Sequence, residues 1–121
     1  MAKTVLIVED NELNMKLFRD LLEAHGYQTV GTNKGIEALD LVRRHRPDLI
    51  LMDIQLPGLD GYEATRRIRA NVELRQIPII AVTSYALSGD DAKAFEAGCD
   101  AYIAKPYSPR ALLAKIREFL S

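Results

Sequence analysis

The sequence predicts an α/β fold in which five parallel strands form one sheet and helices cover it. Strand-like and helix-like patterns alternate along the 121 residues, which is typical of βαβ units. No linker or repeat breaks this alternation, so we expect one domain spanning residues 1–121. Four strand segments are unbroken apolar runs, as expected for strands buried on both faces. These runs are 5–8, 49–52, 79–82 and 101–104.

The first strand is expected at about residues 4–8 and precedes a helix over about 12–24, which Gly26 ends. Apolar side chains at helical spacing predict the inward face of that helix. They are Leu13, Leu17, Phe18, Leu21 and Leu22. Residues 27–32 form a weaker and more polar strand pattern, which places this strand at an edge of the sheet.

The second helix is expected to be capped by Asn33 and to end before Pro47. Its apolar residues are Ile36, Leu39 and Val42. The strand over 49–52 is the most apolar of the five, so we expect it at the centre of the sheet. Asp60 is expected to cap a third helix over about 61–70.

In the last part of the chain, Pro78 precedes the strand over 79–82, and proline suits the start of a strand. The helix over 88–97 has the weakest apolar stripe and should pack least tightly. Its candidate inward residues are Ala92, Phe95 and Ala97. The final helix spans 109–120 with Pro109 in its first position. Its inward residues are Leu112, Leu113, Ile116 and Phe119.

The composition is that of a soluble globular protein and favours a cytoplasmic location. The formal net charge of −1 gives no field that would attract nucleic acid or an anionic membrane. No apolar run approaches the ~18–20 residues of a membrane span, and the N-terminus lacks a signal-peptide layout. The single cysteine, Cys99, excludes an internal disulfide and is expected to be a small core residue in a reducing compartment.

Polar side chains follow the four apolar runs at the point where each strand ends. They are Glu9, Asp10, Asp53, Thr83 and Lys105. Ligands bind just beyond the carboxyl ends of the strands in an open parallel sheet, so these side chains should meet there. Three close carboxylates need a cation between them or a proton on one, and a hard divalent ion such as Mg²⁺ is the simplest solution. A lysine and a threonine beside that ion would form a cradle for phosphoryl oxygens.

Each of these residues also has an ordinary explanation when it is taken alone. Asp53 precedes a turn-forming loop, and Glu9 and Asp10 are common charges at the entry to a helix. Thr83 fits a plain strand-end hydroxyl, and Lys105 fits a solvated lysine. Their joint placement at one edge of one sheet is far more specific, and a carboxylate there can attack phosphorus to form an acyl phosphate.

The motifs that carry these residues resemble the receiver domain of two-component response regulators over the whole chain. They are VLIVEDN at 5–11, DIQLP at 53–57, DG at 60–61, AVT at 81–83, AG at 97–98 and AKP at 104–106. Within that family, VEDNELNM at 8–15 and DIQLP are most similar to stand-alone cell-cycle receivers of the DivK type. The same runs occur in receivers attached to hybrid histidine kinases. The resemblance implies a flavodoxin-like (βα)5 doubly wound sheet with strand order 2-1-3-4-5.

The resemblance implies that Asp53 is the phosphoacceptor. Asp10, Asp53 and the backbone carbonyl of Gln55 would bind Mg²⁺, or Mn²⁺ as an alternative, and Glu9 would hold the ion through a water. The ion would neutralise charge on the transferring group. In this family, the positions of Gln55 and Tyr85 tune dephosphorylation.

The remaining site residues are likewise implied by the resemblance. Thr83, the backbone N–H of Ser84 and Lys105 would contact phosphoryl oxygens. Pro106 would form the family's cis peptide with Lys105 and so aim the lysine. Tyr102 would be the switch aromatic that turns inward when Thr83 moves, although an ordinary amphipathic strand residue explains it equally well.

The function that follows is that of a single-domain response regulator in bacterial cell-cycle or division control. It would take a phosphoryl group from a sensor histidine kinase or a histidine phosphotransferase, and would signal by phosphorylation-dependent binding to a downstream protein. It would be no enzyme beyond its own phosphorylation and slow dephosphorylation, and it would be a monomer or a weak dimer. A phosphorelay shuttle and a receiver cut from a hybrid histidine kinase are alternatives.

Two other function classes share the predicted architecture. A flavin- or nucleotide-binding domain is disfavoured because the chain lacks G-x-G-x-x-G and G-x-x-x-x-G-K-[ST], and strand-end acids repel phosphate unless a metal intervenes. An aspartate-nucleophile phosphatase for small molecules usually carries a second acid two residues after the nucleophile. Here that residue is Gln55, and no cap domain is present to hold a substrate.

Overall fold

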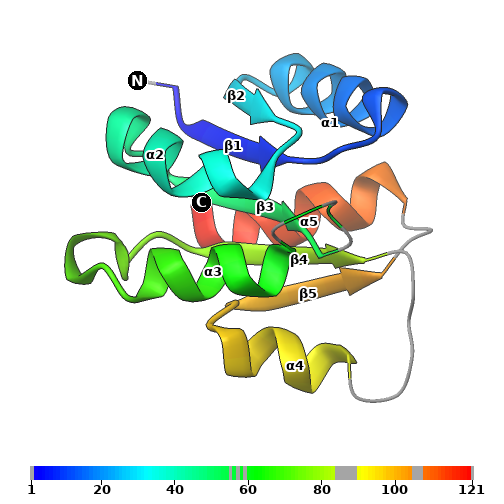
Figure 1. Cartoon of the computed structure of the whole chain (residues 1–121). Helices are drawn as coiled ribbons and strands as arrows, with labels where there is room; N and C mark the ends of the chain where they lie inside the picture. The colour runs from blue at the N-terminus through cyan, green and yellow to red at the C-terminus, as the bar shows by residue number, and fades with distance from the viewer. Residues whose placement is uncertain are drawn as a thin grey trace.

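The computed structural model confirms the predicted doubly wound α/β fold (Figure 1). It describes residues 2–54, 56, 58, 60–83, 90–104 and 108–120. In this part of the chain, five parallel strands form one sheet in the order β2-β1-β3-β4-β5. The strands are β1 (Thr4–Val8), β2 (Gln28–Thr32), β3 (Leu49–Asp53), β4 (Ile79–Thr83) and β5 (Ala101–Ala104). The predicted positions of the most apolar strand at the centre and of the most polar strand at an edge are both correct.

Helices cover both faces of the sheet. They are α1 (Glu12–Ala24), α2 (Gly35–His45), α3 (Gly61–Arg69), α4 (Asp90–Ala97) and α5 (Pro109–Leu120). Apolar residues of α1 and α5 pack in one core cluster, and those of α2, α3 and α4 pack in the other. A short 3₁₀ turn, η1 (Val72–Leu74), was not predicted from the sequence. Of the helices described, none is both long and apolar enough to cross a membrane.

The central strand shows how the sheet divides the core into two layers. All five residues of β3 are buried. Leu49 and Leu51 point into the cluster with α1 and α5, whereas Ile50 and Met52 point into the cluster with α2, α3 and α4. Alternate side chains of a strand point to opposite faces, so a strand buried on both sides is apolar over most of its length, and here only the last residue, Asp53, is polar.

The predicted inward face of α1 is partly wrong. Leu13 and Leu17 are 65% and 56% exposed, whereas Phe18 and Leu22 are buried. Leu21 and Met15 are only partly buried against the same cluster. A helix advances about 100° per residue, so a face centred on Phe18 and Leu22 turns the two earlier leucines toward the outside. The helix therefore carries a second, exposed apolar pair.

The predicted start of α2 is also wrong. The residue before the helix is Lys34, which makes no side-chain capping bond, so Asn33 is not the cap. The hydroxyl of Thr32 instead accepts a hydrogen bond from the backbone N–H of Lys34 at 3.2 Å and donates one to Glu37 at 2.5 Å. Ile36 is 66% exposed and does not belong to the buried stripe of the helix. A threonine that ends the previous strand thus replaces the expected local cap.

Other local predictions are confirmed. The side chain of Asp60 accepts a hydrogen bond from the N–H of Glu63 at 2.9 Å and caps α3. Gly26 ends α1 with φ of +89°, a conformation that glycine adopts at little cost. Cys99 is buried.

Helix α4 packs through small residues. Ala94 and Ala97 are buried, but Phe95 is 51% exposed and Ala92 is exposed, so two of its three predicted inward residues are wrong. Ala94 was overlooked in the sequence pattern. Among residues 92–97, the part of α4 whose burial the structure describes, only two alanine side chains are buried, so little apolar area holds this part of the helix on the sheet. This agrees with the expected weak packing.

Candidate metal centre

Three acidic side chains meet at the carboxyl edge of the sheet. Glu9 and Asp10 follow β1, and Asp53 is the last residue of β3. Val8 is paired with Met52 in the parallel register, so the residues that follow them emerge side by side. One carboxylate oxygen from each acid lies within 4.8 Å of the oxygens from the other two. The structure therefore brings together the three acids that the sequence placed at the strand ends.

The burial of two of these acids strengthens the repulsion between their negative charges. Glu9 and Asp53 are only 2% and 4% exposed, whereas Asp10 is exposed. Like charges at this separation repel, and the repulsion grows where protein replaces water. Carboxylate oxygens are the ligands that Mg²⁺ prefers, and this ion is usually held by one or two carboxylates together with water. The donor set and its spacing therefore fit a hard divalent cation.

Both the backbone and the side chain of Glu9 are fixed by hydrogen bonds. Its N–H donates to the carbonyl oxygen of Thr32 at 3.0 Å, and its carboxylate accepts a hydrogen bond from the N–H of Asn11 at 3.2 Å. The side chain of Asn11 in turn caps α1 by accepting from the N–H of Asn14 at 2.9 Å. This cap is not among the residues predicted from the sequence, although an asparagine directly before a helical pattern is a usual capping signal.

Thr83 lies at the same edge as Asp53. It ends β4 and is 1% exposed. Asp53 is paired with Val82, one residue earlier on β4, and the N–H of Ile54 donates to the carbonyl oxygen of Val82 at 3.0 Å. The predicted hydroxyl group is thus one residue beyond the position that pairs with the predicted phosphoacceptor.

Tyr102 and Thr83 lie on the same face of the sheet, on the adjacent strands β5 and β4. The register pairs Ala81 with Tyr102 and Thr83 with Ala104. Alternate residues share a face, so Thr83 and Tyr102 point to the same side. Tyr102 is half-buried against the cluster that contains Ala81. Tyr102 therefore shares a sheet face with Thr83 and packs in the core cluster that contains residues of α4.

Five other predicted site residues lie outside the described part of the chain: Gln55, Ser84, Tyr85, Lys105 and Pro106.

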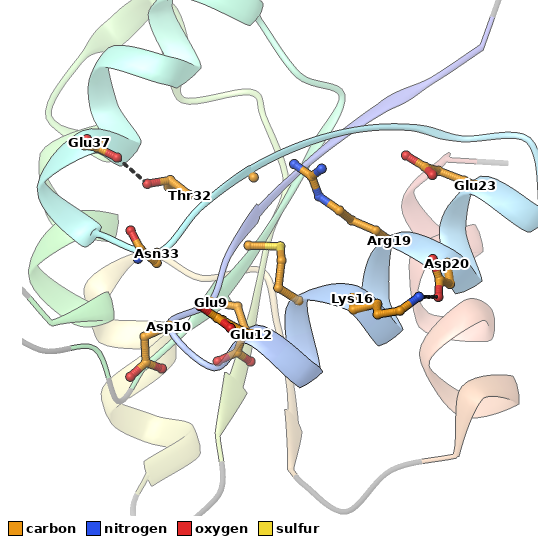
Figure 2. Close-up of a pocket in the computed structure, with 12 residues that line it drawn as sticks. Glu9, Asp10, Glu12, Lys16, Arg19, Asp20, Glu23, Thr32, Asn33 and Glu37 are labelled. Carbon is orange, nitrogen blue, oxygen red and sulfur yellow. Dashed lines mark hydrogen bonds and ion pairs between the residues drawn. The ribbon is translucent and has the colours of Figure 1, made fainter.

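A groove of about 660 Å³ runs from the acids along α1 and β2 (Figure 2). Glu9 and Asp10 lie at one end. Further along, Lys16 forms an ion pair with Asp20 at 2.7 Å, and the hydrogen bond and charge of Asp20 raise the pKa of Lys16. Arg19 extends across the strand at Gly31, where a Cβ atom would be 2.7 Å from its guanidinium. In the outer part of the groove, Lys16 and Asp20 are thus paired with each other.

Comparison with known proteins gives one consistent family. The family model of the response regulator receiver domain matches residues 5–117. The chain is 58% identical over 120 residues to the polar-differentiation response regulator DivK of Brucella anthropi, covering 99% of this chain and 98% of that protein. It is 57% identical to the protein of the same name from Brucella ovis, with the same coverage.

Solved structures agree with this result. The receiver domain of a sensor histidine kinase from Pseudomonas aeruginosa, with a magnesium ion coordinated in its active site cleft, is 40% identical with a TM-score of 0.92. A response regulator structure from Chloroflexus aurantiacus is 31% identical with a TM-score of 0.94. Each comparison covers 99% of this chain and 98% of the other.

Proposed function

The chain belongs to the response regulator receiver domain family, and from this premise we propose that it accepts a phosphoryl group on Asp53 and signals by binding another protein. The observation that carries the proposal is the cluster of three carboxylates, with Asp53 at the end of the central strand. We propose that residues 1–121 act as a single receiver domain with a role in cell-cycle control, as the similarity to DivK suggests.

The acidic cluster is proposed to hold Mg²⁺, with Mn²⁺ as an alternative. Asp10, Asp53 and the backbone carbonyl of Gln55 would bind the ion directly, and Glu9 would hold it through a water. The spacing of the three carboxylates supports this assignment. When bound, the ion would offset the negative charge that an incoming phosphoryl group brings to the two buried acids.

The proposed chemistry is a transfer from phosphohistidine to carboxylate. An oxygen of Asp53 attacks phosphorus, the bond from phosphorus to the imidazole nitrogen breaks, and the imidazole leaves with the partner protein. The product is an acyl phosphate, which water later hydrolyses. Thr83, the N–H of Ser84 and Lys105 would donate hydrogen bonds to the phosphoryl oxygens. The burial of Thr83 at the same edge supports its part in this cradle.

Further roles in this proposal follow from family membership. The peptide bond before Pro106 would aim Lys105, and Gln55 and Tyr85 would tune the rate of hydrolysis. Tyr102 would report the position of Thr83 to the surface formed by α4, β5 and α5. The strand register that places these two side chains on one face supports this route. The chain would catalyse only its own phosphorylation and dephosphorylation.

The proposed phosphodonor is a sensor histidine kinase or a histidine phosphotransferase. Leu13 and Leu17 are exposed on α1, which begins two residues after Asp10. A partner that brings phosphohistidine to Asp53 would pass over this pair, and exposed apolar side chains beside a reactive site favour a protein contact. The proposal places the protein in the cytoplasm with such a kinase.

A second candidate is that the chain is the receiver of a hybrid histidine kinase. The similarity to a sensor kinase receiver from Pseudomonas aeruginosa favours it. In that case the site would act in the same way, but the output would be transfer to a phosphotransferase rather than protein binding. Transfer from the phosphorylated chain to a panel of purified phosphotransferases, measured beside target capture, separates the two.

The test of the proposed site is intact-mass spectrometry after incubation with acetyl phosphate and Mg²⁺. The wild type should gain one phosphoryl group, and neither Asp53→Ala nor an EDTA-treated sample should gain any. Asp40→Ala removes an exposed carboxylate from α2 and should be labelled like the wild type. Persistent labelling of Asp53→Ala would show that another residue is the acceptor.

A further inference from the structure

Gly61, the first residue of α3, lies directly on the backbone that carries Asp53. A Cβ atom built at Gly61 would be 2.2 Å from the carbonyl oxygen of Asp53 and 2.8 Å from the Cα atom of Ile54. It would also be 3.0 Å from the carbonyl carbon of Asp53. All three are backbone atoms, which cannot rotate away as the end of a long side chain can. Any larger residue would therefore have to displace either α3 or the end of β3.

The reason why position 61 needs a glycine differs from the reason at the other glycines whose surroundings the structure describes. Gly26 and Gly58 have φ angles of +89° and +75° and open space around them, so they serve turns. Gly98 has a φ angle of +115° and lies against the side chain of Arg69. Gly31 lies against the side chains of Met15 and Arg19, which can shift. Gly61 is not among the residues with positive φ. Its small size is required by a close approach rather than by a turn.

Neither partner in this contact can retreat easily. The end of β3 is held by β4, because Asp53 pairs with Val82 and the N–H of Ile54 donates to the carbonyl of Val82 at 3.0 Å. Helix α3 is held by Ala64 and Ile68, which are 2% and 0% exposed in the core. A methyl group at position 61 would therefore press on the residue that presents the carboxylate.

A hydrogen bond ties the same contact to the loop between β3 and α3. The N–H of Gly61 donates to the carbonyl oxygen of Ile54 at 3.2 Å, and the N–H of Leu56 donates to that oxygen at 3.2 Å. Leu56 and Gly61 are thus both hydrogen-bonded to the residue directly after Asp53.

We propose that Gly61 is a positioning residue for the acidic cluster, setting the place of Asp53 relative to Glu9 and Asp10; this inference rests on the proposed function. One carboxylate oxygen from each of the three acids lies within 4.8 Å of those from the other two, so a small displacement of Asp53 changes their fit to one cation. Misplacing a reacting group by about 1 Å can lower a rate by roughly a hundredfold.

The experiment compares Gly61→Ala with Ile68→Ala. Both changes affect α3, but Ile68 lies seven residues, about two turns, further along the helix and packs in the buried core, so it serves as the measure of loosening the helix. Mg²⁺ affinity is measured from amide chemical shifts during titration with MgCl₂. The phosphorylation rate is measured by intact mass with acetyl phosphate, at a temperature where circular dichroism shows each variant folded.

Gly61→Ala should weaken Mg²⁺ binding and slow phosphorylation, each by about tenfold. Ile68→Ala should lose more stability while both site measurements stay within about twofold of the wild type. Wild-type site properties in folded Gly61→Ala, or an equal loss in Ile68→Ala, would overturn the proposal. If Gly61→Ala is unfolded in buffer, all proteins are compared in trimethylamine N-oxide, which favours compact states. A variant that stays unfolded there while Ile68→Ala folds would mean that the fold, not the site, requires this glycine.

The two proposals can fail separately. A wild type that takes up no phosphoryl group would contradict the proposed function. The Mg²⁺ titration of the two variants would still decide whether Gly61 positions the acidic cluster.

Discussion

The two edges of the sheet use aspartate in opposite ways. At the amino edge, Asp48 precedes β3 and Asp100 precedes β5, and each accepts a backbone hydrogen bond from the first residue of a neighbouring strand. At the carboxyl edge, Asp10 and Asp53 crowd together with Glu9. The first arrangement satisfies each charge, whereas the second concentrates charge. One edge therefore joins strands through satisfied carboxylates, whereas the other gathers acids whose spacing suits a bound cation.

At the amino edge, the same pair of hydrogen bonds between an aspartate and the first residue of a neighbouring strand occurs at two places. The carboxylate of Asp48 accepts from the N–H of Thr4 at 2.8 Å, and the N–H of Asp48 donates to the carbonyl of Thr4 at 2.8 Å. The carboxylate of Asp100 accepts from the N–H of Ile79 at 2.9 Å, and its N–H donates to the carbonyl of Ile79 at 2.8 Å. Each pair joins two adjacent strands where they begin, so terminal backbone groups are satisfied.

Arg69 adds a charged link at the same edge. Its guanidinium donates to the carboxylate of Asp100 at 2.6 Å and to the carbonyl oxygens of Gly98 and Ile77 at 2.8 Å each. The side chain is only 17% exposed. One residue thus connects the end of α3 to the segments before β4 and β5. Its planar group suits several acceptors at once.

The largest effect is expected from breaking this link. Arg69→Met should lower the free energy of unfolding by about 2–3 kcal/mol, because it leaves Asp100 and several carbonyls without a charged donor. The measurement is urea unfolding. Arg44→Met removes an exposed ion pair with Asp40 and should cost less than about 0.5 kcal/mol. Equal costs in the two variants would mean that the Arg69 network contributes no more than a surface pair.

A smaller effect of opposite sign is expected at the carboxyl edge. Asp10→Asn should raise the free energy of unfolding by about 1 kcal/mol in EDTA, because it removes one of three mutually repelling charges. In saturating Mg²⁺ the advantage should disappear, because the wild type binds the ion more tightly. Thermal unfolding with and without MgCl₂ checks both statements.

The control for this prediction is Asp20→Asn. It removes an exposed carboxylate that pairs with Lys16, so it should not stabilise the protein. An unchanged or lower melting temperature for Asp10→Asn in EDTA would mean that repulsion at the carboxyl edge is too weak to matter.

An effect that appears only at high pH concerns Cys99, which lies at the amino edge beside Asp100. Burial raises the pKa of this thiol to about 11 from an ordinary value of 9.0. The unfolded chain therefore ionises first, so the thiol's contribution to stability is complete below about pH 9 and is lost as the pH rises to about 11. The free energy of unfolding, measured with urea between pH 8 and pH 11, should fall more steeply with pH for the wild type than for Cys99→Ala. Parallel curves would contradict the raised pKa.

The sequence predicted the carboxyl edge better than the amino edge. The acids that end apolar runs are visible as residue types, and the rule for parallel sheets brings Asp10 and Asp53 together. The pair of Asp48 with Thr4 depends on strand register, which a single sequence does not state. The contact of Gly61 with Asp53 is hidden for the same reason, because it depends on the angle at which α3 packs.

The errors on helices have a common physical cause. Leu13 and Leu17 repeat at the spacing of a buried face, but periodicity alone does not say which of two apolar faces meets the sheet. Ile36 was misplaced in the same way at the start of α2. Asn33 failed as a cap because the hydroxyl of Thr32 already satisfies that backbone. Tertiary contacts decided each case where local preferences left a choice.

We propose that the carboxyl edge accepts a phosphoryl group and passes the change to α4 and β5, while the amino edge stays fixed. The most direct measurement is the change in amide chemical shifts on adding beryllofluoride, a phosphoryl mimic, with Mg²⁺. Large changes are expected at Asp10, Asp53 and Thr83, and also across residues 90–97 and 101–104, with small changes at Asp48. No change at Asp53 would contradict the acceptor site, and changes confined to residues touching Asp53 would contradict the switch.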